Sequence, residues 1–174
     1  MFYTLMGIQK YDETQYSKNI RVAVRAIIMK DGKLLLIQSC YDDYKFPGGG
    51  VEGNESHEEA LKREVAEEAG YTQCVVKEKI GMVIEKQIDQ YMPSAIFEMH
   101  SHYYICEVTG EKGLQKLDDY ESEQNFTPRF VTIDEAICQN ERVAKQSNSN
   151  GWIERETYVL KELAQQLLLR NNFS

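Results

Sequence analysis

Three glutamates at helical spacing, Glu64, Glu67 and Glu68, are the residues best placed for chemistry. They occupy positions i, i+3 and i+4 of a run without glycine or proline, so on a helix they fall within about 100° of arc. Like charges at these spacings repel one another unless a cation relieves the repulsion. Carboxylate oxygens are ligands that Mg²⁺ and Mn²⁺ prefer. The spacing alone fits either a solvated acidic face or a divalent-cation site.

The position of the acidic arc favours the cation site. Leu61, Val65 and Ala69 recur at intervals of four and form an apolar stripe, and the glutamates border that stripe instead of lying opposite it. Arg63 is placed to brace a carboxylate through a bidentate pair. A divalent cation held there would let this acidic chain bind a small phosphorylated ligand.

The stretch from Gly49 to Tyr71 resembles the Nudix box, G-x5-E-x7-R-E-U-x-E-E-x-G-U, where U is a bulky apolar residue. Every fixed position matches, and Tyr71 at the last U is the loosest fit. The preceding Phe46-Pro47-Gly48-Gly49-Gly50 matches the usual lead-in of the family. Gly53-Asn54 is a small departure, because many members have Pro-Gly before the box glutamate.

This resemblance implies an α/β fold, an α/β/α sandwich around a mixed sheet, with residues 1–174 forming one domain. It implies hydrolysis, dependent on Mg²⁺ or Mn²⁺, of a nucleoside diphosphate linked to another moiety. Carried over by position, Glu64 and Glu68 are the principal metal ligands and Glu67 is a third ligand or the base. The backbone carbonyl of Gly49 is a further ligand. Glu55 and Arg63 map to a salt bridge that holds the loop–helix–loop together.

Many members of the family recruit one more carboxylate from a loop after the box. The segment from Thr109 to Pro128 offers Glu121 and Glu123 equally, and we take Glu123 as the catalytic candidate. Glu85, on a strand after the box, is another possible ligand. The candidates for substrate binding lie on the first long strand and around the glycine run: Arg25, Tyr44, Phe46, Gly48 and Gly49.

The elements that must position these residues are readable from local patterns. Apolar runs predict strands over 21–28, 33–38, 75–85, 96–108 and 129–133, and Asp31-Gly32 predicts a tight hairpin between the first two. Ser56-x-x-Glu59 predicts the start of the box helix and Gly70 its end. A second capping box at Thr132 predicts a short helix through Cys138. A loop over 147–151 and an amphipathic helix over 153–169 complete the prediction.

Composition narrows the classes of partner. The 174 residues carry 20 basic and 28 acidic side chains, a net charge of −8, which argues against a nucleic-acid groove. No apolar run approaches the roughly 18 residues of a membrane span, and no secretory signal is readable. The four cysteines include no C-x-x-C pair, so we expect reduced thiols and a cytoplasmic protein. A small nucleotide is the expected substrate, and a second copy of the chain is a candidate partner.

The sequence leaves the substrate open between a nucleotide-sugar and a nucleoside triphosphate. ADP-ribose pyrophosphatases of the family often carry a proline about 15 residues after the box, and here the next proline is Pro93, so ADP-ribose is disfavoured. Three alternatives remain: a catalytically silent nucleotide sensor, an RNA 5′-end pyrophosphohydrolase, and an isoprenoid diphosphate isomerase. The isomerase would need a catalytic cysteine such as Cys40 or Cys106.

Overall fold

The computed structural model describes residues 1–12, 14–146 and 149–171. The elements follow in chain order: β1 (Phe2–Gly7), β2 (Ser17–Lys30), β3 (Lys33–Gln38), β4 (Tyr44–Lys45), α1 (His57–Ala69), β5 (Gln73–Ile88), β6 (Ala95–Thr109), α2 (Asp119–Glu123), β7 (Thr127–Val131), α3 (Ile133–Ala144) and α4 (Ile153–Asn171).

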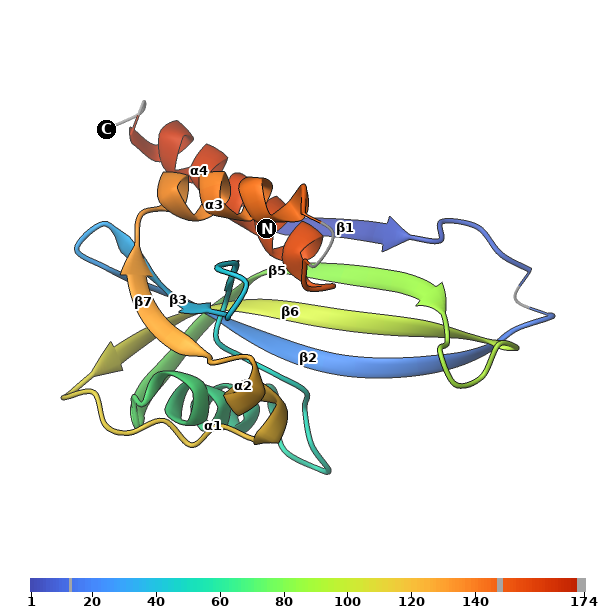
Figure 1. Cartoon of the computed structure of the whole chain (residues 1–174), viewed down its shortest axis with the longest axis horizontal. Helices are drawn as coiled ribbons and strands as arrows, with labels where there is room; N and C mark the ends of the chain where they lie inside the picture. Colours follow the sequence, from blue (N-terminus) through green and yellow to red (C-terminus); the bar gives the residue numbers. More distant parts are fainter. Residues whose placement is uncertain (13, 147–148, 172–174) are drawn as a thin grey trace.

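The strands form one mixed sheet between two layers of helices. Its order is β1-β5-β6-β2-β3-β4, with β7 also paired to β3. The pairs β1/β5 and β2/β6 are parallel and the others antiparallel. One core cluster, around Leu61 and Val65, lies between the sheet and α1, and the other, around Tyr103 and Leu160, lies between the sheet and α3 and α4. The predicted α/β/α sandwich is confirmed (Figure 1).

Helix α1 forms as its sequence predicts. The Ser56 side chain accepts from the backbone N–H of Glu59, the Glu59 carboxylate accepts from the backbone N–H of Ser56, and Gly70 ends the helix in the left-handed conformation at φ +79°. The stripe of Leu61, Val65 and Ala69 is fully buried. Both ends and the orientation of α1 are therefore set by its own residues, and this fixes the face from which its glutamates project.

Several boundaries differ from the predicted ones. Strand β2 begins at Ser17, before the predicted start at residue 21. The earlier start was not predicted because these first residues are exposed and show no alternation of apolar and polar side chains. Strand β1, an exposed edge, and the short elements β4 and α2 were not predicted. Helix α3 continues to Ala144. Of the loop predicted over 147–151, residues 147 and 148 lie outside the described residues.

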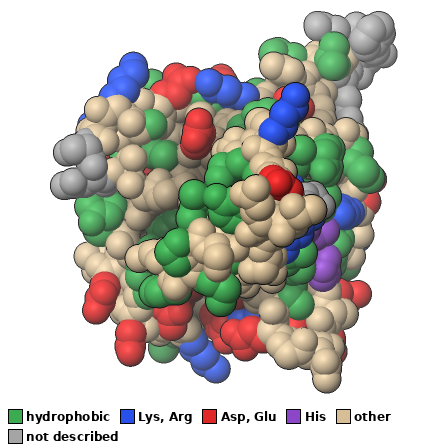
Figure 2. All heavy atoms as spheres, turned by 90° about the vertical axis from the view of Figure 1, so that its right-hand side faces the viewer, with side chains coloured by type: hydrophobic (Ala, Val, Ile, Leu, Met, Phe, Trp, Pro, Cys, Tyr) green, Lys and Arg blue, Asp and Glu red, His purple; other side chains and the backbone are tan. Residues whose placement is uncertain are grey.

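The long strands β2, β5 and β6 extend past the helices at one end of the molecule (Figure 1). Viewed from that end, hydrophobic side chains are visible across the surface (Figure 2). On β2, at the end of β5 and in the β5–β6 connection, four hydrophobic residues are more than half exposed: Ile20, Ile88, Tyr91 and Met92. No helix in the described part of the chain is long and apolar enough to cross a membrane.

Candidate active site

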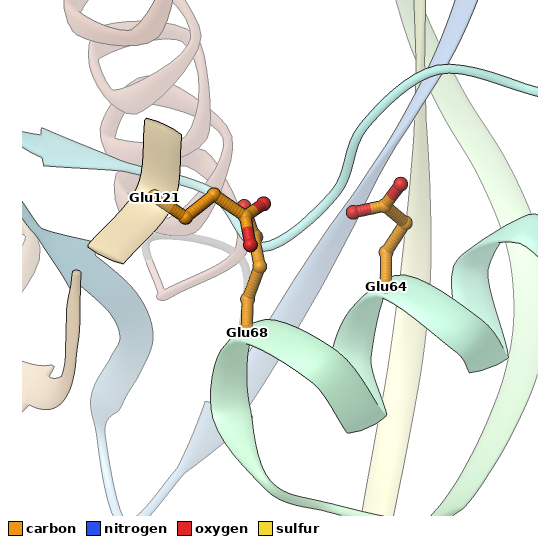
Figure 3. Close-up of side chains that lie close together, drawn as sticks. All are labelled: Glu64, Glu68 and Glu121. Carbon is orange, nitrogen blue, oxygen red and sulfur yellow. The ribbon is translucent and has the colours of Figure 1, made fainter. Parts of the chain in front are cut away.

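Three carboxylates from two helices converge on one point. Glu64 and Glu68 project from α1 and Glu121 from α2, and one oxygen of each lies within 4.8 Å of the others (Figure 3). We call Glu64, Glu68 and Glu121 the carboxylate triad. Glu121 is held by its own capping box, in which its Oε2 accepts from the backbone N–H of Asp118 at 3.0 Å. Oxygen ligands grouped in this way suit a hard divalent cation.

The glycine run brings backbone against the triad. Gly48 donates its N–H to Glu68 Oε2 at 2.8 Å, and it adopts φ +143° with Val24 O 2.0 Å from where a Cβ would stand. A Cβ on Gly49 would lie 2.3 Å from Glu64 Oε1. Neither position can carry a side chain while the carboxylates stay where they are. The Gly49 carbonyl accepts from Val24 N at 3.0 Å and keeps a second lone pair.

The positive charges near the triad only partly offset the effects of burial and repulsion on its carboxylates. Burial raises the pKa of Glu64, and the neighbouring charge of Glu68 raises it further. Burial likewise raises the pKa of Glu68, although Lys45 opposes this shift. Burial raises the pKa of both carboxyls, and a second triad member (Glu68 for Glu64, Glu121 for Glu68) raises each further. A cation would stabilise such a site, so the donor set fits Mg²⁺ or Mn²⁺.

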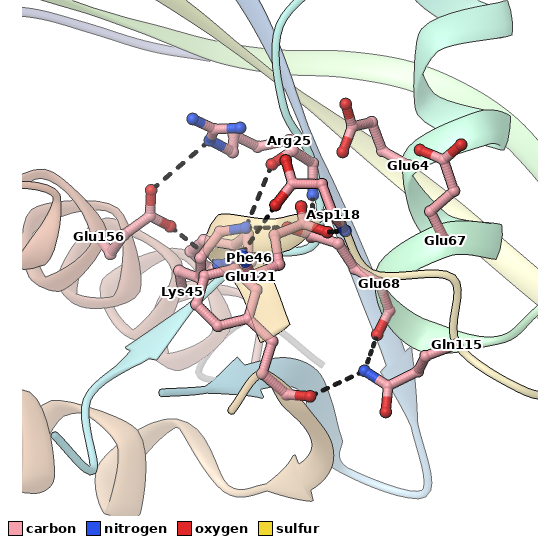
Figure 4. A network of polar contacts seen from close by, with 12 residues as sticks. Arg25, Lys45, Phe46, Glu64, Glu67, Glu68, Gln115, Asp118, Glu121 and Glu156 are labelled. Atoms are coloured by element: carbon pink, nitrogen blue, oxygen red, sulfur yellow. Dashed lines mark hydrogen bonds and ion pairs between the residues drawn. The ribbon is translucent and has the colours of Figure 1, made fainter. Parts of the chain in front are cut away.

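A buried lysine is the nearest cation to Glu68. Lys45 Nζ forms an ion pair with Glu68 Oε1, donates to the Gly48 carbonyl at 3.3 Å, and lies 4.7 Å from the centroid of the Phe126 ring (Figure 4). Both partners of this ion pair are nearly inaccessible to solvent. An ion pair in such surroundings is sensitive to the loss of either partner.

Arg63 links the box loop to α1. Its Nη2 donates to Glu55 Oε1 at 2.6 Å and to the Gly50 carbonyl at 3.0 Å, and its Nη1 reaches Glu64 Oε1 at 2.8 Å and Glu67 Oε2 at 3.2 Å. The hydrogen bond from Arg63 lowers the pKa of Glu55. This geometry suits the structural salt bridge expected for Glu55 and Arg63.

The triad borders a cavity of about 610 Å³, which we call the central cavity. This volume is ordinary for a site that binds a small molecule. Besides the triad, Glu67 and the glycines 48–50, its walls include basic and aromatic side chains: Arg21, Arg25, Lys45, Arg63, Lys116, Arg155, Tyr120, Phe126 and Trp152. Acidic groups for a cation and basic groups for phosphate thus share one space.

The family model described as the NUDIX domain matches residues 19–150, which is more than half of the chain. The chain belongs to the NUDIX domain family. A Caenorhabditis elegans protein named as a nudix hydrolase is 39% identical over 113 residues, covering 60% of this chain and 28% of that protein. An ADP-ribose pyrophosphatase of Methanocaldococcus jannaschii is 42% identical over 74 residues, covering 39% of this chain and 44% of that protein. The chain therefore spans less than half the length of either relative.

A NUDIX hydrolase structure from Nitrosomonas europaea supports the fold. It aligns with a TM-score of 0.56 at 19% identity, covering 84% of this chain and 90% of that chain. An identity this low carries the fold alone, and the function must be argued from the site.

Of the carboxylates expected in this NUDIX site, two lie elsewhere. Glu123 is exposed and is not among the described residues that line the central cavity. On a helix, two residues of separation turn the side chain by about 200°, so when Glu121 faces the triad Glu123 faces solvent. Glu85 pairs with Arg155 Nη1 and likewise does not line the cavity. The geometry favours Glu121 over both.

The side chains of Tyr44 and Phe46 also lie outside the central cavity, contrary to their expected role in substrate binding. Phe46 is fully buried and packs edge-on against Tyr103, with 5.8 Å between ring centroids. Tyr44 packs against the core between the sheet and α3 and α4, and its backbone bonds to the Asn140 side chain. Both aromatics pack in or against the core, while Gly48 and Gly49, also candidates for substrate binding, lie against Glu68 and Glu64.

Arg25, a candidate to hold a phosphate, lines the central cavity. It is buried, and its Nε lies 3.8 Å from Glu156 Oε1, too far for a hydrogen bond. Glu156, on α4, also accepts from the Phe46 backbone N–H at 3.0 Å and the Arg155 Nε at 2.9 Å. Lys45 and Glu156 carry no local sequence signal, because the residues that they contact, Glu68 and Phe46, are 23 and 110 positions away.

Proposed function

We propose that this chain hydrolyses the diphosphate linkage of a nucleoside diphosphate derivative, with Mg²⁺ or Mn²⁺ held by Glu64, Glu68, Glu121 and the Gly49 carbonyl. The observation that carries the proposal is the convergence of the triad within 4.8 Å beside a cavity that also presents arginines. Although Arg63 pairs with Glu64 and Lys45 with Glu68, burial and repulsion still raise the pKa of both carboxyls, as is common at functional sites.

Residues of the chain itself would bind the phosphates and accept the proton. When bound, the cation would neutralise phosphate charge and lower the pKa of a water. Arg25 and Arg21 are placed to hold phosphate oxygens, and the bare backbone of Gly48 and Gly49 lets the diphosphate approach closely. The Glu67 side chain is 38% exposed and pairs with Arg63, and it is our candidate to accept the proton of the attacking water.

We propose a nucleoside diphosphate sugar as the substrate, with a nucleoside triphosphate as the second candidate. The Methanocaldococcus relative, an ADP-ribose pyrophosphatase, supports the sugar class, because that class includes ADP-ribose. The expectation that ADP-ribose is disfavoured rests on one missing proline and stays a prediction. A small nucleotide, a cytoplasmic location and the absence of nucleic-acid binding remain part of the proposal; the net charge of −8 and four free cysteines support them.

The alternatives find less support. A silent sensor would have no need of an intact triad. Among the described residues that line the central cavity there is no cysteine, and Cys106 is buried in the core against α1, which disfavours an isomerase. A long RNA would meet an acidic surface.

The test is an assay of phosphate products with ADP-ribose, other nucleotide-sugars, nucleoside triphosphates and 5′-triphosphate RNA, each with Mg²⁺, with Mn²⁺ and with excess chelator. We expect turnover of a nucleotide-sugar that chelator abolishes. Glu121→Gln should lower kcat at least tenfold, while its neighbour Glu123→Gln should leave kcat within twofold of wild type. Turnover that persists in chelator would overturn the metal assignment, and preference for RNA would overturn the substrate class.

A further inference from the structure

Three aromatic side chains that the proposed chemistry does not use line the central cavity: Tyr120, Phe126 and Trp152. The rings of Phe126 and Trp152 lie 5.9 Å apart at 81°, and those of Tyr120 and Phe126 lie 6.3 Å apart at 79°. Phe126 is buried, whereas Tyr120 is 51% exposed. We call these three residues the aromatic wall.

The indole N–H of Trp152 is an unsatisfied hydrogen-bond donor among the described residues. Its indole Nε1–H is shielded from solvent and has no hydrogen-bond partner among the described residues. Buried donors are nearly always satisfied, because an unmade hydrogen bond in the interior costs free energy. Arg25, which lines the same cavity, has a buried Nε that likewise lacks a hydrogen-bond partner in the described part of the chain. Both unsatisfied donors belong to residues that line the central cavity, and acceptor atoms of a ligand bound there would satisfy them.

The backbone around Trp152 is held firmly. Just before it, the Asn150 side chain donates to Asp43 Oδ2 at 2.9 Å and to Ser39 Oγ at 3.2 Å. Just after it, α4 begins, and the Trp152 carbonyl accepts from the backbone N–H of Glu156 at 3.0 Å. Because both sides of Trp152 are anchored, the backbone cannot easily shift to give the indole another partner.

The aromatic wall adjoins the triad. Lys45 Nζ, which pairs with Glu68, lies 4.7 Å from the Phe126 ring centroid, and Phe126 contacts Trp152. Tyr120 directly precedes Glu121 on α2. A molecule with its diphosphate at the triad would therefore bring the group on its adjoining sugar to the wall.

We propose that the aromatic wall binds the nucleobase of the substrate and that Trp152 Nε1 donates a hydrogen bond to an acceptor on that base. This inference rests on the proposed function, because it assumes a nucleotide with its diphosphate at the triad. A base offers both of the features that the wall can use: a π-face for contact with aromatic rings and acceptor atoms at its edge. A sugar alone offers no π-face. Trp152 is thus assigned as a specificity-determining residue.

The first test uses the intrinsic fluorescence of the protein, because Trp152 is the only tryptophan of the chain. The full chain is titrated with AMP and UMP, and with ribose 5-phosphate as the probe that lacks a base. We expect saturable quenching by at least one of the two nucleotides and none by ribose 5-phosphate. No change with either nucleotide, or an equal change with ribose 5-phosphate, would overturn the inference.

The second test separates base recognition from folding. Trp152→Phe keeps an aromatic ring and removes the donor, so KM for the nucleotide-sugar should rise roughly three- to tenfold with kcat within about twofold. Trp152→Leu should raise KM more than tenfold, because ring contact is lost too. Tyr91→Leu, on an exposed turn outside the cavity lining, is the control and should change neither constant. A fall in melting temperature with KM unchanged in Trp152→Phe would make the residue structural.

The outcomes of these tests distinguish failure of this inference from failure of the proposed function. If no compound is hydrolysed but AMP or UMP quenches the fluorescence of Trp152, base binding at the aromatic wall is supported and the hydrolase proposal is contradicted. If a nucleotide-sugar is hydrolysed with unchanged KM in Trp152→Phe and Trp152→Leu, only the inference falls.

Discussion

Two buried carboxylates in this molecule, one in the carboxylate triad and one outside it, have pKa values shifted in opposite directions. Glu68, in the carboxylate triad, is 1% exposed, and Glu98, on β6, is 5% exposed. Glu98 accepts from Tyr11 Oη, Lys86 Nζ and His100 Nε2, each at 3.0 Å. Burial alone would raise its pKa, but hydrogen bonds from these three partners outweigh burial and lower the pKa of Glu98 to about 2. In the triad the balance is reversed, and the pKa of Glu68 is raised.

The difference shows that burial does not decide what a carboxylate does; its partners do. Glu98 has three donors around one carboxylate, which stabilises the charged form and the fold. The triad has three carboxylates and few donors, an arrangement that costs stability and is typical of a functional site. The following predictions test this contrast.

The largest expected effect is on catalysis. Glu64→Gln should lower kcat by a factor of about 10² to 10³, since an electrostatic group at the reacting phosphate is lost. The melting temperature without metal should hold or rise, because repulsion from Glu68 is relieved. The control is Glu58→Gln on the same helix, an exposed residue paired with Lys62, which should leave kcat unchanged. Unchanged kcat with a lower melting temperature in Glu64→Gln would make Glu64 structural.

Next in size is the loss of the lysine that pairs with Glu68. Lys45→Met should destabilise the metal-free protein by about 3 kcal/mol, because a buried carboxylate loses its partner. Mn²⁺ should restore more of the melting temperature to this variant than it adds to wild type, since the cation replaces the lost charge. Lys62→Met, which breaks the exposed pair with Glu58, should change stability little, because solvent screens that pair, and should show no such rescue. Equal responses to Mn²⁺ in both variants would contradict the account.

The smallest expected effect belongs to the fully paired carboxylate. Glu98→Gln should lose about 1.5 kcal/mol of stability at neutral pH, as charged hydrogen bonds become neutral ones, with kcat unchanged. The folded pKa of about 2 lies below the usual 4.5, so the contribution is full above about pH 4.5 and is lost as the pH falls toward 2. Thermal melts of both proteins should therefore differ at pH 7 and converge near pH 2. A constant difference across that range would show that charge is not the cause.

Local patterns explain how much could be predicted from the sequence. The Asp31-Gly32 turn and the Ser56–Glu59 capping box depend on neighbours in the chain, and both form as predicted. Glu121 had a local signal as well, since Asp118-x-x-Glu121 is a capping box that would have separated it from Glu123.

The parts that could not be predicted depend on distant segments. Phe46 and Tyr44 were expected near the substrate because they flank the glycine run, but which face of the sheet they occupy is decided by packing against Tyr103 and α3. The unsatisfied indole of Trp152 can be recognised only when the segment before α4 is packed against Phe126. Long-range pairing of this kind leaves no spacing in the sequence to detect.

The central claim is that the carboxylate triad binds a divalent cation and the paired carboxylates do not. The most direct measurement is a Mn²⁺ titration followed by electron paramagnetic resonance of the free ion, with wild type, Glu64→Gln and Glu98→Gln compared at one pH. The account predicts that Glu64→Gln binds Mn²⁺ at least tenfold more weakly than wild type, while Glu98→Gln binds it as wild type does. Equal binding by all three proteins, or no binding by wild type, would contradict it.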